Sequence, residues 1–285
     1  MAPRESVRRR CAVLGSPIAH SMSPALHRAA YAHLGLDWDY GRYEVDESTL
    51  AAFLAGLDSS WRGLSLTMPL KQAVIPYLDE ISETARSVAA VNTVLLEPDG
   101  SRRGDNTDVP GMVNALRERG VGRVGQGTVL GGGATARSAL AVLREVADAA
   151  TVYVRTPSRA EQLTATAGRL GLNISIRPWG EREGGLAAGV VVVTTTVGAT
   201  DDLAAVVPDA PGALVDVVYN AGVSPLAAAW AATGAPVVGG LDVLVHQAVV
   251  QVELMTGRSV TADVLRAGAG LQSPVSAAKA ARHHP

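Results

Sequence analysis

Cysteine is almost absent from this sequence. It occurs once, at Cys11, in a chain of 285 residues. A single cysteine excludes an internal disulfide and a cysteine-rich zinc site. We interpret Cys11 as a small buried residue at the start of a strand. No cluster of metal-ligating residues is visible elsewhere in the sequence, so we expect no bound metal.

An excess of either charge is also missing. The chain has 25 basic and 27 acidic side chains, a net charge of −2, with 47% hydrophobic and 18% charged residues. This composition is typical of a folded globular protein. The balanced charge argues against nucleic acid or a membrane surface as the main partner.

Long apolar runs are the third feature that the sequence lacks. No run approaches the roughly 18 residues of a membrane span. Only the short apolar segment 11–15 follows the basic residues 1–10, whereas a signal peptide needs a longer apolar region. We therefore expect a cytoplasmic protein.

Three consecutive glycines stand near the middle of the chain, between a short apolar run and an alanine-rich segment of helix period. Residues 131–136 match the relaxed dinucleotide-binding fingerprint, with alanine in the third glycine position. Such a turn presents backbone N–H groups and a positive helix end to a phosphate. The alternative is a left-handed turn that only joins strand to helix, but the strand-before-helix context favours a nucleotide site. The candidate residues are Gly131, Gly132, Gly133, Ala134 and Thr135.

The end of the next expected strand indicates which cofactor binds. An NAD site places an Asp or Glu about 20 residues after the glycines, where it accepts from the ribose 2′-OH. Here the segment 153–159 contains no acid but has Arg155, Thr156 and Arg159. Guanidinium groups suit a 2′-phosphate. Solvated surface arginines are the alternative, more so for Arg159, and the segment predicts NADP rather than NAD.

Strand-like and helix-like segments alternate along the chain, which predicts βαβ units, a mostly parallel sheet and the α/β fold class. The nucleotide unit begins near residue 108 and leaves an α/β block of about a hundred residues before it. We expect two lobes with a cleft between them. The expected domains are a substrate-binding domain, 1–107 together with 242–285, and a dinucleotide-binding domain, 108–241. Expected strands are 10–15, 37–45, 63–67, 90–96, 127–130, 151–154, 173–176, 189–194 and 213–218; expected helices are 24–34, 47–57, 80–88, 109–119, a helix ending at 147, 158–170 and 243–255.

Two features of the first block bear on chemistry. Ser21 and Ser23 put two hydroxyls on one side of an extended loop, which suits a carboxylate or a polyol. A simple helix N-cap by Ser23 before Pro24 explains that serine equally well. Lys71 follows a strand end and a proline, and a lysine held in a cleft can act as a general acid. On these residues alone, a solvated surface lysine is the commoner interpretation.

Seven short motifs in order change that balance. Together they resemble the shikimate dehydrogenase (shikimate/quinate dehydrogenase) family from about residue 11 to 275. The motifs are 21–24, 67–71, 90–93, 106–108, the glycine turn, 216–220 with 224–226, and 240–247. The resemblance implies reversible NADPH-dependent reduction of 3-dehydroshikimate to shikimate in aromatic amino-acid biosynthesis. It also implies an N-terminal α/β substrate domain followed by a Rossmann-type NADP-binding domain.

The resemblance also assigns roles to individual residues. It makes Lys71 the catalytic proton donor and acceptor, paired with Asp108. It places Ser21, Ser23 and Tyr219 at the substrate carboxylate, and it gives the ring hydroxyls to Thr67, Asn92, Asp108 and Gln247. On the cofactor side it adds Glu83, Val217 and Gly240, and a close backbone approach at Gly240 requires glycine.

Three departures from the family pattern affect the cofactor and the site. Val154 precedes Arg155 where the family usually has asparagine, which removes one polar contact to the adenosine phosphate. The segment 193–198 replaces the family's usual Asn-Ala-Thr-Ser loop, which puts the nicotinamide contacts in question. Val109 stands where glycine usually follows the catalytic aspartate. None of these removes the pair of Lys71 and Asp108.

Other functions compete with this one. A quinate/shikimate dehydrogenase that uses NAD is the nearest, and Arg155 argues against it. A non-catalytic paralogue that binds a small acid and a nucleotide is opposed by the intact Lys71, Asn92 and Asp108. A folate-type methylene dehydrogenase leaves the serine pair and the 240–247 motif unexplained. The sequence leaves the oligomeric state open and is compatible with a homodimer.

Overall fold

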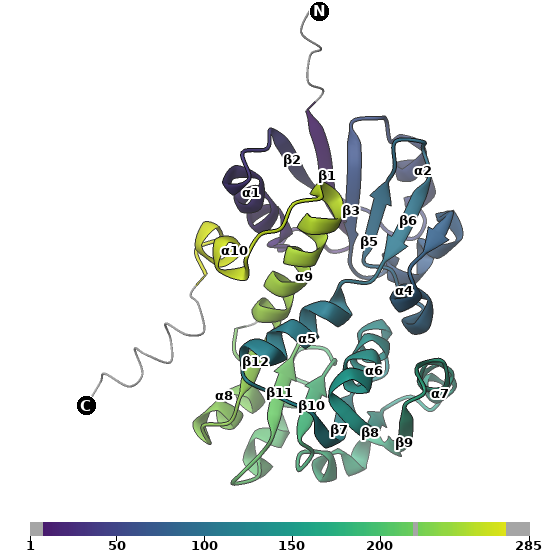
Figure 1. Ribbon diagram of the computed structural model, residues 1–285. Helices are drawn as coiled ribbons and strands as arrows, with labels where there is room; N and C mark the ends of the chain where they lie inside the picture. The colour runs from purple at the N-terminus through teal and green to yellow at the C-terminus, as the bar shows by residue number, and fades with distance from the viewer. Residues whose placement is uncertain (1–7, 219–221, 272–285) are drawn as a thin grey trace, which may run out of the picture. The chain divides into compact units, whose positions relative to one another are not determined.

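The computed structural model describes residues 8–218 and 222–271. Packing divides the chain into two units. Unit 1 contains the described residues 8–81, 91–107 and 248–271, and unit 2 contains the described residues 82–90, 108–218 and 222–247. Each unit is built on one six-stranded sheet (Figure 1), so the predicted α/β class is confirmed. The expected domain bounds stay a prediction, and the packing units differ from them in residues 82–90 and 242–247.

The sheet of unit 1 is mixed, with the strand order β2-β1-β3-β5-β6-β4. The first three strands of the chain run parallel, and β5 is antiparallel to both of its neighbours. The strands of unit 1 are β1 (Arg9–Gly15), β2 (Trp38–Glu44), β3 (Trp61–Leu66), β4 (Glu80–Ile81), β5 (Thr93–Leu96) and β6 (Arg102–Asp105). Its helices are α1 (Ser23–His33), α2 (Leu50–Ala55), α3 (Leu70–Ala73), the 3₁₀ turn η1 (Ile75–Tyr77) and α10 (Ala262–Gly268).

Gly15, at the end of β1, lets the segment after β3 come close. A Cβ atom on Gly15 would lie 2.3 Å from Thr67 Cγ2 and 2.9 Å from the Met68 carbonyl oxygen. The Ser16 N–H donates to that carbonyl at 3.0 Å, and the Thr67 N–H donates to the Leu14 carbonyl at 2.9 Å. Glycine therefore fixes the start of the segment 67–71 against the carboxyl end of β1.

The sheet of unit 2 is fully parallel, with the order β12-β11-β10-β7-β8-β9. Counted in chain order within the unit, this is 6-5-4-1-2-3, the doubly wound arrangement whose strand order reverses between β7 and β10. Its strands are β7 (Val124–Leu130), β8 (Ala147–Val154), β9 (Asn173–Pro178), β10 (Val190–Val193), β11 (Ala213–Asp216) and β12 (Val237–Gly239). Its helices are α4 (Glu83–Val88), α5 (Asp108–Glu118), α6 (Ala134–Val146), α7 (Arg159–Leu170), η2 (Trp179–Gly185), η3 (Asp201–Val206) and α8 (Pro225–Ala232). Helix α9 (Gly240–Thr256) begins in unit 2 and contributes its residues from 248 onward to unit 1.

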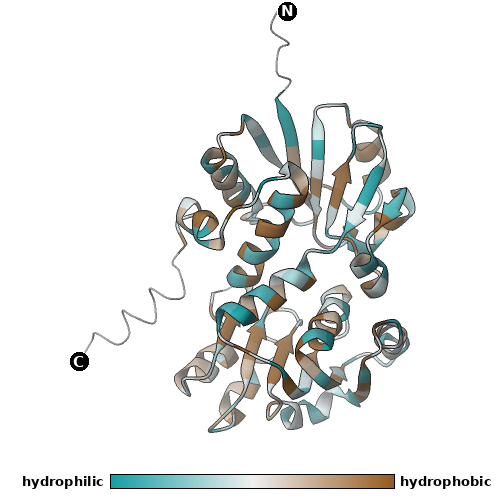
Figure 2. Ribbon diagram, in the orientation of Figure 1, coloured by the Kyte–Doolittle hydropathy of each residue, from teal (hydrophilic) through white to brown (hydrophobic). Residues whose placement is uncertain are grey.

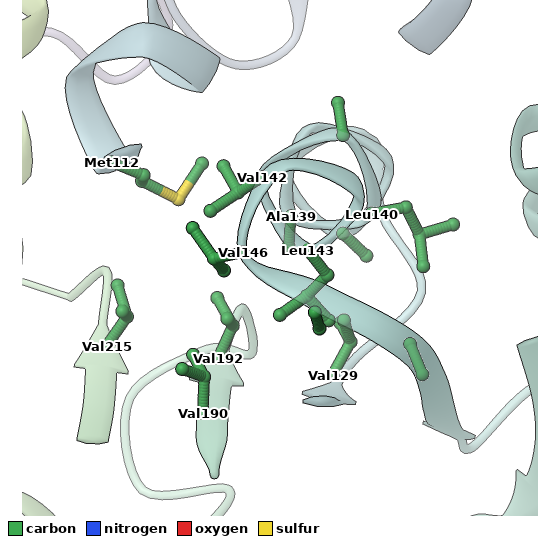
Figure 3. Packing of buried hydrophobic residues seen from close by; sticks show 14 of the residues in the cluster. Met112, Val129, Ala139, Leu140, Val142, Leu143, Val146, Val190, Val192 and Val215 are labelled. Carbon is green, nitrogen blue, oxygen red and sulfur yellow. The ribbon is translucent and has the colours of Figure 1, made fainter. Parts of the chain in front are cut away.

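Both faces of the unit 2 sheet are covered by apolar side chains, and Figure 2 shows β10 and β11 as strongly hydrophobic. Val190 and Val192 belong to one buried cluster and Val191 and Val193 to another, because successive side chains of a strand point to opposite faces. On the first face, side chains of α6 and Met112 of α5 pack over the valines of β7, β10 and β11 (Figure 3). Each such buried side chain stabilises the fold by about 1.5–3 kcal/mol.

Several predicted elements differ from those in the structure. Residues Glu80–Ile81 form β4, paired with β6, so the helix expected from residue 80 begins only at Glu83. The helix expected over 47–57 is shortened to Leu50–Ala55, because the Asp46 carboxylate accepts from the N–H groups of Ser48 and Thr49 and holds them in a turn. The strand expected at 151–154 begins at Ala147. Strands β6 and β12 were not expected at all.

The N-cap role considered for Ser23 is wrong. Helix α1 begins at Ser23 itself, its N-cap residue is Met22, and no side chain caps it. The Ser23 N–H instead faces the Ser21 hydroxyl at 3.4 Å. The Ser23 hydroxyl therefore does not cap α1.

Candidate active site

The glycine turn of unit 2 lies at the point where the strand order of its sheet reverses. Gly131 has φ +130°, and a Cβ atom there would lie 2.4 Å from Thr194 Oγ1. The Gly131 N–H donates to the Tyr153 carbonyl, and the Thr194 N–H and hydroxyl both donate to the Leu130 carbonyl. Only glycine tolerates this conformation and this approach. The turn leads directly into α6, whose first residues are Ala134 and Thr135.

The segment after β8 lies beside the same turn. A Cβ atom on Gly132 would be 3.1 Å from the Cβ of Arg159, the first residue of α7. Arg155 is exposed, and its guanidinium carbon lies 5.7 Å from the centroid of the Trp179 ring. Thr156 is exposed, and its carbonyl accepts from the Arg159 N–H at 3.0 Å. Two guanidinium groups, a hydroxyl and the N-terminus of α6 thus gather at one edge of the sheet, which suits a phosphate-rich ligand.

Glu83 lies in unit 2, exposed in the first turn of α4. Arg137, in the first turns of α6, holds this short helix by donating to the carbonyls of Val88 (2.8 Å) and Ala89 (3.2 Å) at its C-terminus. Burial, followed by the neighbouring charges of Arg159 and Arg169, lowers the pKa of the Arg137 guanidinium. Arg137 therefore has a structural role that the sequence motif did not reveal.

Val217 and Gly240 contact each other. A Cβ atom on Gly240 would lie 2.4 Å from the Val217 carbonyl oxygen. The requirement for glycine expected at residue 240 is thus explained by the chain's own backbone. Tyr219, expected near the substrate carboxylate, lies outside the described residues.

A hollow of about 140 Å³ lies near these residues, at the carboxyl ends of β10 and β11. Asp216 lies in its wall, where its carboxylate accepts from the Ser224 hydroxyl at 2.6 Å and from the Val218 N–H at 3.2 Å. Ser224 also caps α8, accepting from the Ala227 N–H. Thr195 lines the same hollow, and its buried hydroxyl has no hydrogen-bond partner among the described residues. We did not single out Thr195 from the sequence, although three threonines directly after a run of valines were a signal.

The expected substrate residues of unit 1 gather at the carboxyl ends of its parallel strands. Ser21 and Ser23 are buried, with 6% and 4% of their surface exposed, and Asn92 is buried with 2% exposed. Thr67 follows β3, and the Leu70 N–H donates to its carbonyl at 2.8 Å. Lys71, in α3, is half-buried, and its carbonyl accepts from the Val91 N–H at 2.7 Å. This hydrogen bond ties the backbone of Lys71 to Val91, the residue that precedes Asn92.

Asp108 and Gln247 belong to unit 2, and each lies next to the chain's passage between the units. Asp108 is buried as the first residue of α5, where a carboxylate is favoured by the helix dipole. It directly follows Thr107, whose N–H donates to Asn92 Oδ1 at 2.8 Å within unit 1. Gln247 is buried on α9, where its side chain donates to the Leu244 carbonyl at 2.9 Å. A Cβ atom on Gly111 would lie 2.8 Å from Gln247 Cβ, so glycine at 111 lets α5 and α9 approach.

Two family models match the chain. Residues 13–94 match the "Shikimate dehydrogenase substrate binding domain", and residues 240–267 match the "Shikimate 5'-dehydrogenase C-terminal domain". A shikimate dehydrogenase (NADP(+)) from Thermus thermophilus is 36% identical over 252 residues, which cover 87% of this chain and 92% of that protein.

The chain belongs to the shikimate dehydrogenase family.

Solved structures of this family share the whole fold. The shikimate dehydrogenase of Mycobacterium tuberculosis matches with a TM-score of 0.84 and 35% identity, covering 92% of this chain and 98% of that one. The Thermus thermophilus enzyme in complex with NADP(H) and shikimate matches with a TM-score of 0.81 and 34% identity, covering 92% and 98%. The resemblance inferred from seven short motifs is thereby confirmed.

Within the described ranges, no three His, Cys, Asp or Glu side chains group as metal ligands would. None of the helices in that part of the chain combines the length and the apolar character needed to cross a membrane.

Proposed function

We propose that this chain catalyses the reversible NADPH-dependent reduction of 3-dehydroshikimate to shikimate. It is an oxidoreductase acting on a CH–OH group, with NADP as its cofactor. The observation that carries this function is the similarity to NADP-dependent shikimate dehydrogenases over nearly the whole length of both chains. The partners in this function are two small molecules.

The residues of unit 2 fit a dinucleotide. Gly131 leaves no room for a side chain against Thr194, and the turn brings the N-terminus of α6 to the end of β7, which supports binding of the pyrophosphate there. Arg155, Thr156 and Arg159 are the donors for the 2′-phosphate, and no acid stands at the end of β8 to accept from a free 2′-OH. When bound, NADPH supplies the hydride that adds to the carbonyl carbon of the substrate. Glu83, Val217 and Gly240 complete the proposed cofactor contacts, and the hollow beside Val218 and Thr195 is the proposed place for the nicotinamide side.

The residues that the family motifs assign to the substrate hold and protonate it in this proposal. The hydroxyls of Ser21 and Ser23, with Tyr219, bind the substrate carboxylate, and Thr67, Asn92, Asp108 and Gln247 bind the ring hydroxyls. Negative charge grows on the carbonyl oxygen as the carbonyl carbon is reduced, and the ammonium of Lys71 stabilises that charge by donating its proton. The carboxylate of Asp108 orients the lysine. In the reverse reaction, Lys71 accepts the proton of the reacting hydroxyl.

The nearest alternative is a quinate/shikimate dehydrogenase that uses NAD. Steady-state rates with shikimate and with quinate, each with NADP and with NAD, decide between them. We expect shikimate with NADP to give the highest kcat/KM. A higher value for quinate with NAD would overturn the cofactor and substrate assignments, and no turnover with any pair would instead support a non-catalytic paralogue.

A further inference from the structure

We propose that Gln251 is a positioning residue of the substrate site, because its carboxamide sets the direction of a hydrogen-bond chain that runs from Ser23 to Asn92 and Thr107. The inference rests on the proposed function, which assigns Ser23 and Asn92 to the substrate. All residues of this hydrogen-bond chain belong to unit 1. Nothing in the sequence motifs singled out Gln251, Thr93 or Ser65.

The Gln251 carboxamide makes four hydrogen bonds while only 1% of the residue is exposed. Its Oε1 atom accepts from Ser65 Oγ at 2.8 Å and lies 3.2 Å from His27 Nε2. Its Nε2 atom donates to the Asn92 carbonyl oxygen at 3.2 Å and to Thr93 Oγ1 at 2.8 Å. A carbonyl oxygen can only accept, so Nε2 must face Asn92. The amide therefore has a single orientation that satisfies all of its neighbours.

This orientation fixes the hydroxyls on the Oε1 side. Ser65 has one hydroxyl hydrogen and donates it to Gln251 Oε1. Tyr40 must then donate to Ser65, at 2.5 Å. The Tyr40 hydroxyl also interacts with Ser23, and since its own hydrogen is used, it can only accept from the Ser23 hydroxyl. The polarity set at Gln251 thus reaches a serine of the proposed carboxylate site.

The same orientation assigns the tautomer of His27. Because Gln251 Oε1 can only accept, His27 carries its hydrogen on Nε2, and Nδ1 is a buried acceptor without a partner among the described residues. Burial lowers the pKa of His27 to about 4, so the imidazole is neutral near pH 7. The ring stacks on Tyr40 with centroids 4.0 Å apart.

On the Nε2 side, the direction continues to the second group of substrate residues. Thr93 accepts from Gln251 and donates to Asn92 Oδ1 at 2.9 Å. The Thr107 N–H also donates to Asn92 Oδ1 at 2.8 Å, and Asn92 Nδ2 donates to Thr107 Oγ1 at 3.0 Å. The Asn92 carboxamide is therefore held with its oxygen toward Thr93 and Thr107. Thr107 directly precedes Asp108 in the sequence. An acceptor in place of the Gln251 amide nitrogen would draw the Thr93 hydrogen away from Asn92.

The variant Gln251→Glu tests this, because it keeps the shape of the side chain and replaces the donor by an acceptor. We expect kcat/KM for shikimate to fall by about 10- to 100-fold, the range for a buried polar group left unsatisfied. The KM for NADP should stay within about twofold. The control is Val252→Ala, which removes packing at the next, fully buried residue of α9 without touching the hydrogen-bond chain. It should lower Tm and leave kcat/KM within about twofold. A Gln251→Glu enzyme with a lowered Tm but an unchanged kcat/KM would overturn the positioning role.

A double-mutant cycle tests the relay itself. Thr93→Val removes the hydroxyl that passes the direction to Asn92 and should also lower kcat/KM for shikimate. Once that hydroxyl is gone, adding Gln251→Glu should lower kcat/KM only slightly further. The kcat/KM of the double variant should therefore resemble that of the more impaired single variant. Losses that multiply would show independent roles and overturn the relay. Should Gln251→Glu fail to fold, Thr93→Val against Val252→Ala carries the test, and an unchanged kcat/KM in Thr93→Val contradicts the proposal.

One measurement is independent of any activity. The ¹⁵N NMR spectrum of His27 at pH 7 should show a neutral imidazole protonated on Nε2. The Nδ1-protonated tautomer would reverse the direction and overturn the inference even in an active enzyme. If the wild-type protein turned over no shikimate, the proposed function would fail, while the His27 tautomer would still test the hydrogen-bond chain.

Discussion

The glycine turn proposed for the pyrophosphate in unit 2 is made of backbone, whereas the proposed substrate residues of unit 1 act through their side chains. In unit 2, Gly131 and Gly132 open space by having no side chain, and the strands beneath them are packed with valine. In unit 1, Asn92 is held by hydrogen bonds from its neighbour Thr93 and from Thr107 and Gln251, which lie in two other segments of the chain. The first arrangement depends on volume and φ. The second depends on which atom of each pair carries the hydrogen.

This difference predicts how the two units respond to substitution. A larger side chain in the glycine turn displaces backbone and should weaken cofactor binding. A changed polar group in unit 1 leaves the backbone in place but misdirects a donor, and should act on the substrate and on kcat. Cofactor affinity and turnover should therefore separate cleanly between variants of the two units.

The largest effect is expected at Lys71. Replacing its ammonium by the apolar side chain of Met (Lys71→Met) removes the proposed proton donor, and general acid catalysis is worth about 10²- to 10⁴-fold in rate. We expect kcat to fall by that factor while the Kd for NADPH, measured by fluorescence titration, stays within about twofold. A Lys71→Met enzyme with near-normal kcat would contradict the assignment of chemistry to unit 1.

The converse is expected at Gly131. An alanine there is strained at φ +130° and places its Cβ 2.4 Å from Thr194 Oγ1. Such strain costs about 2–3 kcal/mol, so the Kd for NADPH should rise by about 30- to 150-fold. The control is Gly171→Ala at the end of α7, where φ is +63° and no atom lies within 4 Å of the added Cβ. That variant should lose about 1 kcal/mol of stability and bind NADPH normally. Equal Kd changes in both variants would show that the glycine turn has no special role.

The buried polar chain of unit 1 should also make stability depend on pH. Burial lowers the pKa of His27 from 6.5 to about 4, so below pH 6.5 the unfolded chain binds a proton that the folded chain does not. The stability that His27 contributes is fully present above pH 6.5 and is lost as the pH falls toward 4, a change of about 3 kcal/mol. Urea unfolding between pH 4 and 7 measures it.

The matched variants for this measurement lie on the same helix. His27→Phe should flatten the pH dependence of the unfolding free energy, because phenylalanine does not titrate. His33→Gln changes an exposed histidine in the last turn of α1 and should leave the dependence as it is. An unchanged slope in His27→Phe would assign it to other groups.

The same comparison explains what could be predicted from the sequence. The glycine turn is contiguous, so residues 131–136 indicate their own geometry and the cofactor class. The substrate residues were assigned through short family motifs, but the network behind them joins residues 27, 40, 65, 93 and 251, whose proximity no local pattern encodes. The wrong N-cap role of Ser23 has the same origin, because its side chain interacts with Tyr40, seventeen positions away in the printed sequence. Strand β4 was missed because two residues carry no periodicity.

The smallest effect, and the one that tests the cofactor side most finely, is expected at Arg155. Its guanidinium is exposed, so its hydrogen bonds to a 2′-phosphate compete with water, and Arg155→Gln should lower kcat/KM for NADP by about 10-fold. The value for NAD, which has no 2′-phosphate, should not change. Arg182→Gln is the control, since Arg182 lies over the same Trp179 ring at 4.9 Å but pairs with Asp202. If both variants altered the NADP to NAD ratio equally, support of the Trp179 ring, rather than contact with the phosphate, would explain the preference. A change confined to Arg155→Gln would place cofactor choice at the end of β8, separate from the Gly131 turn that sets overall affinity.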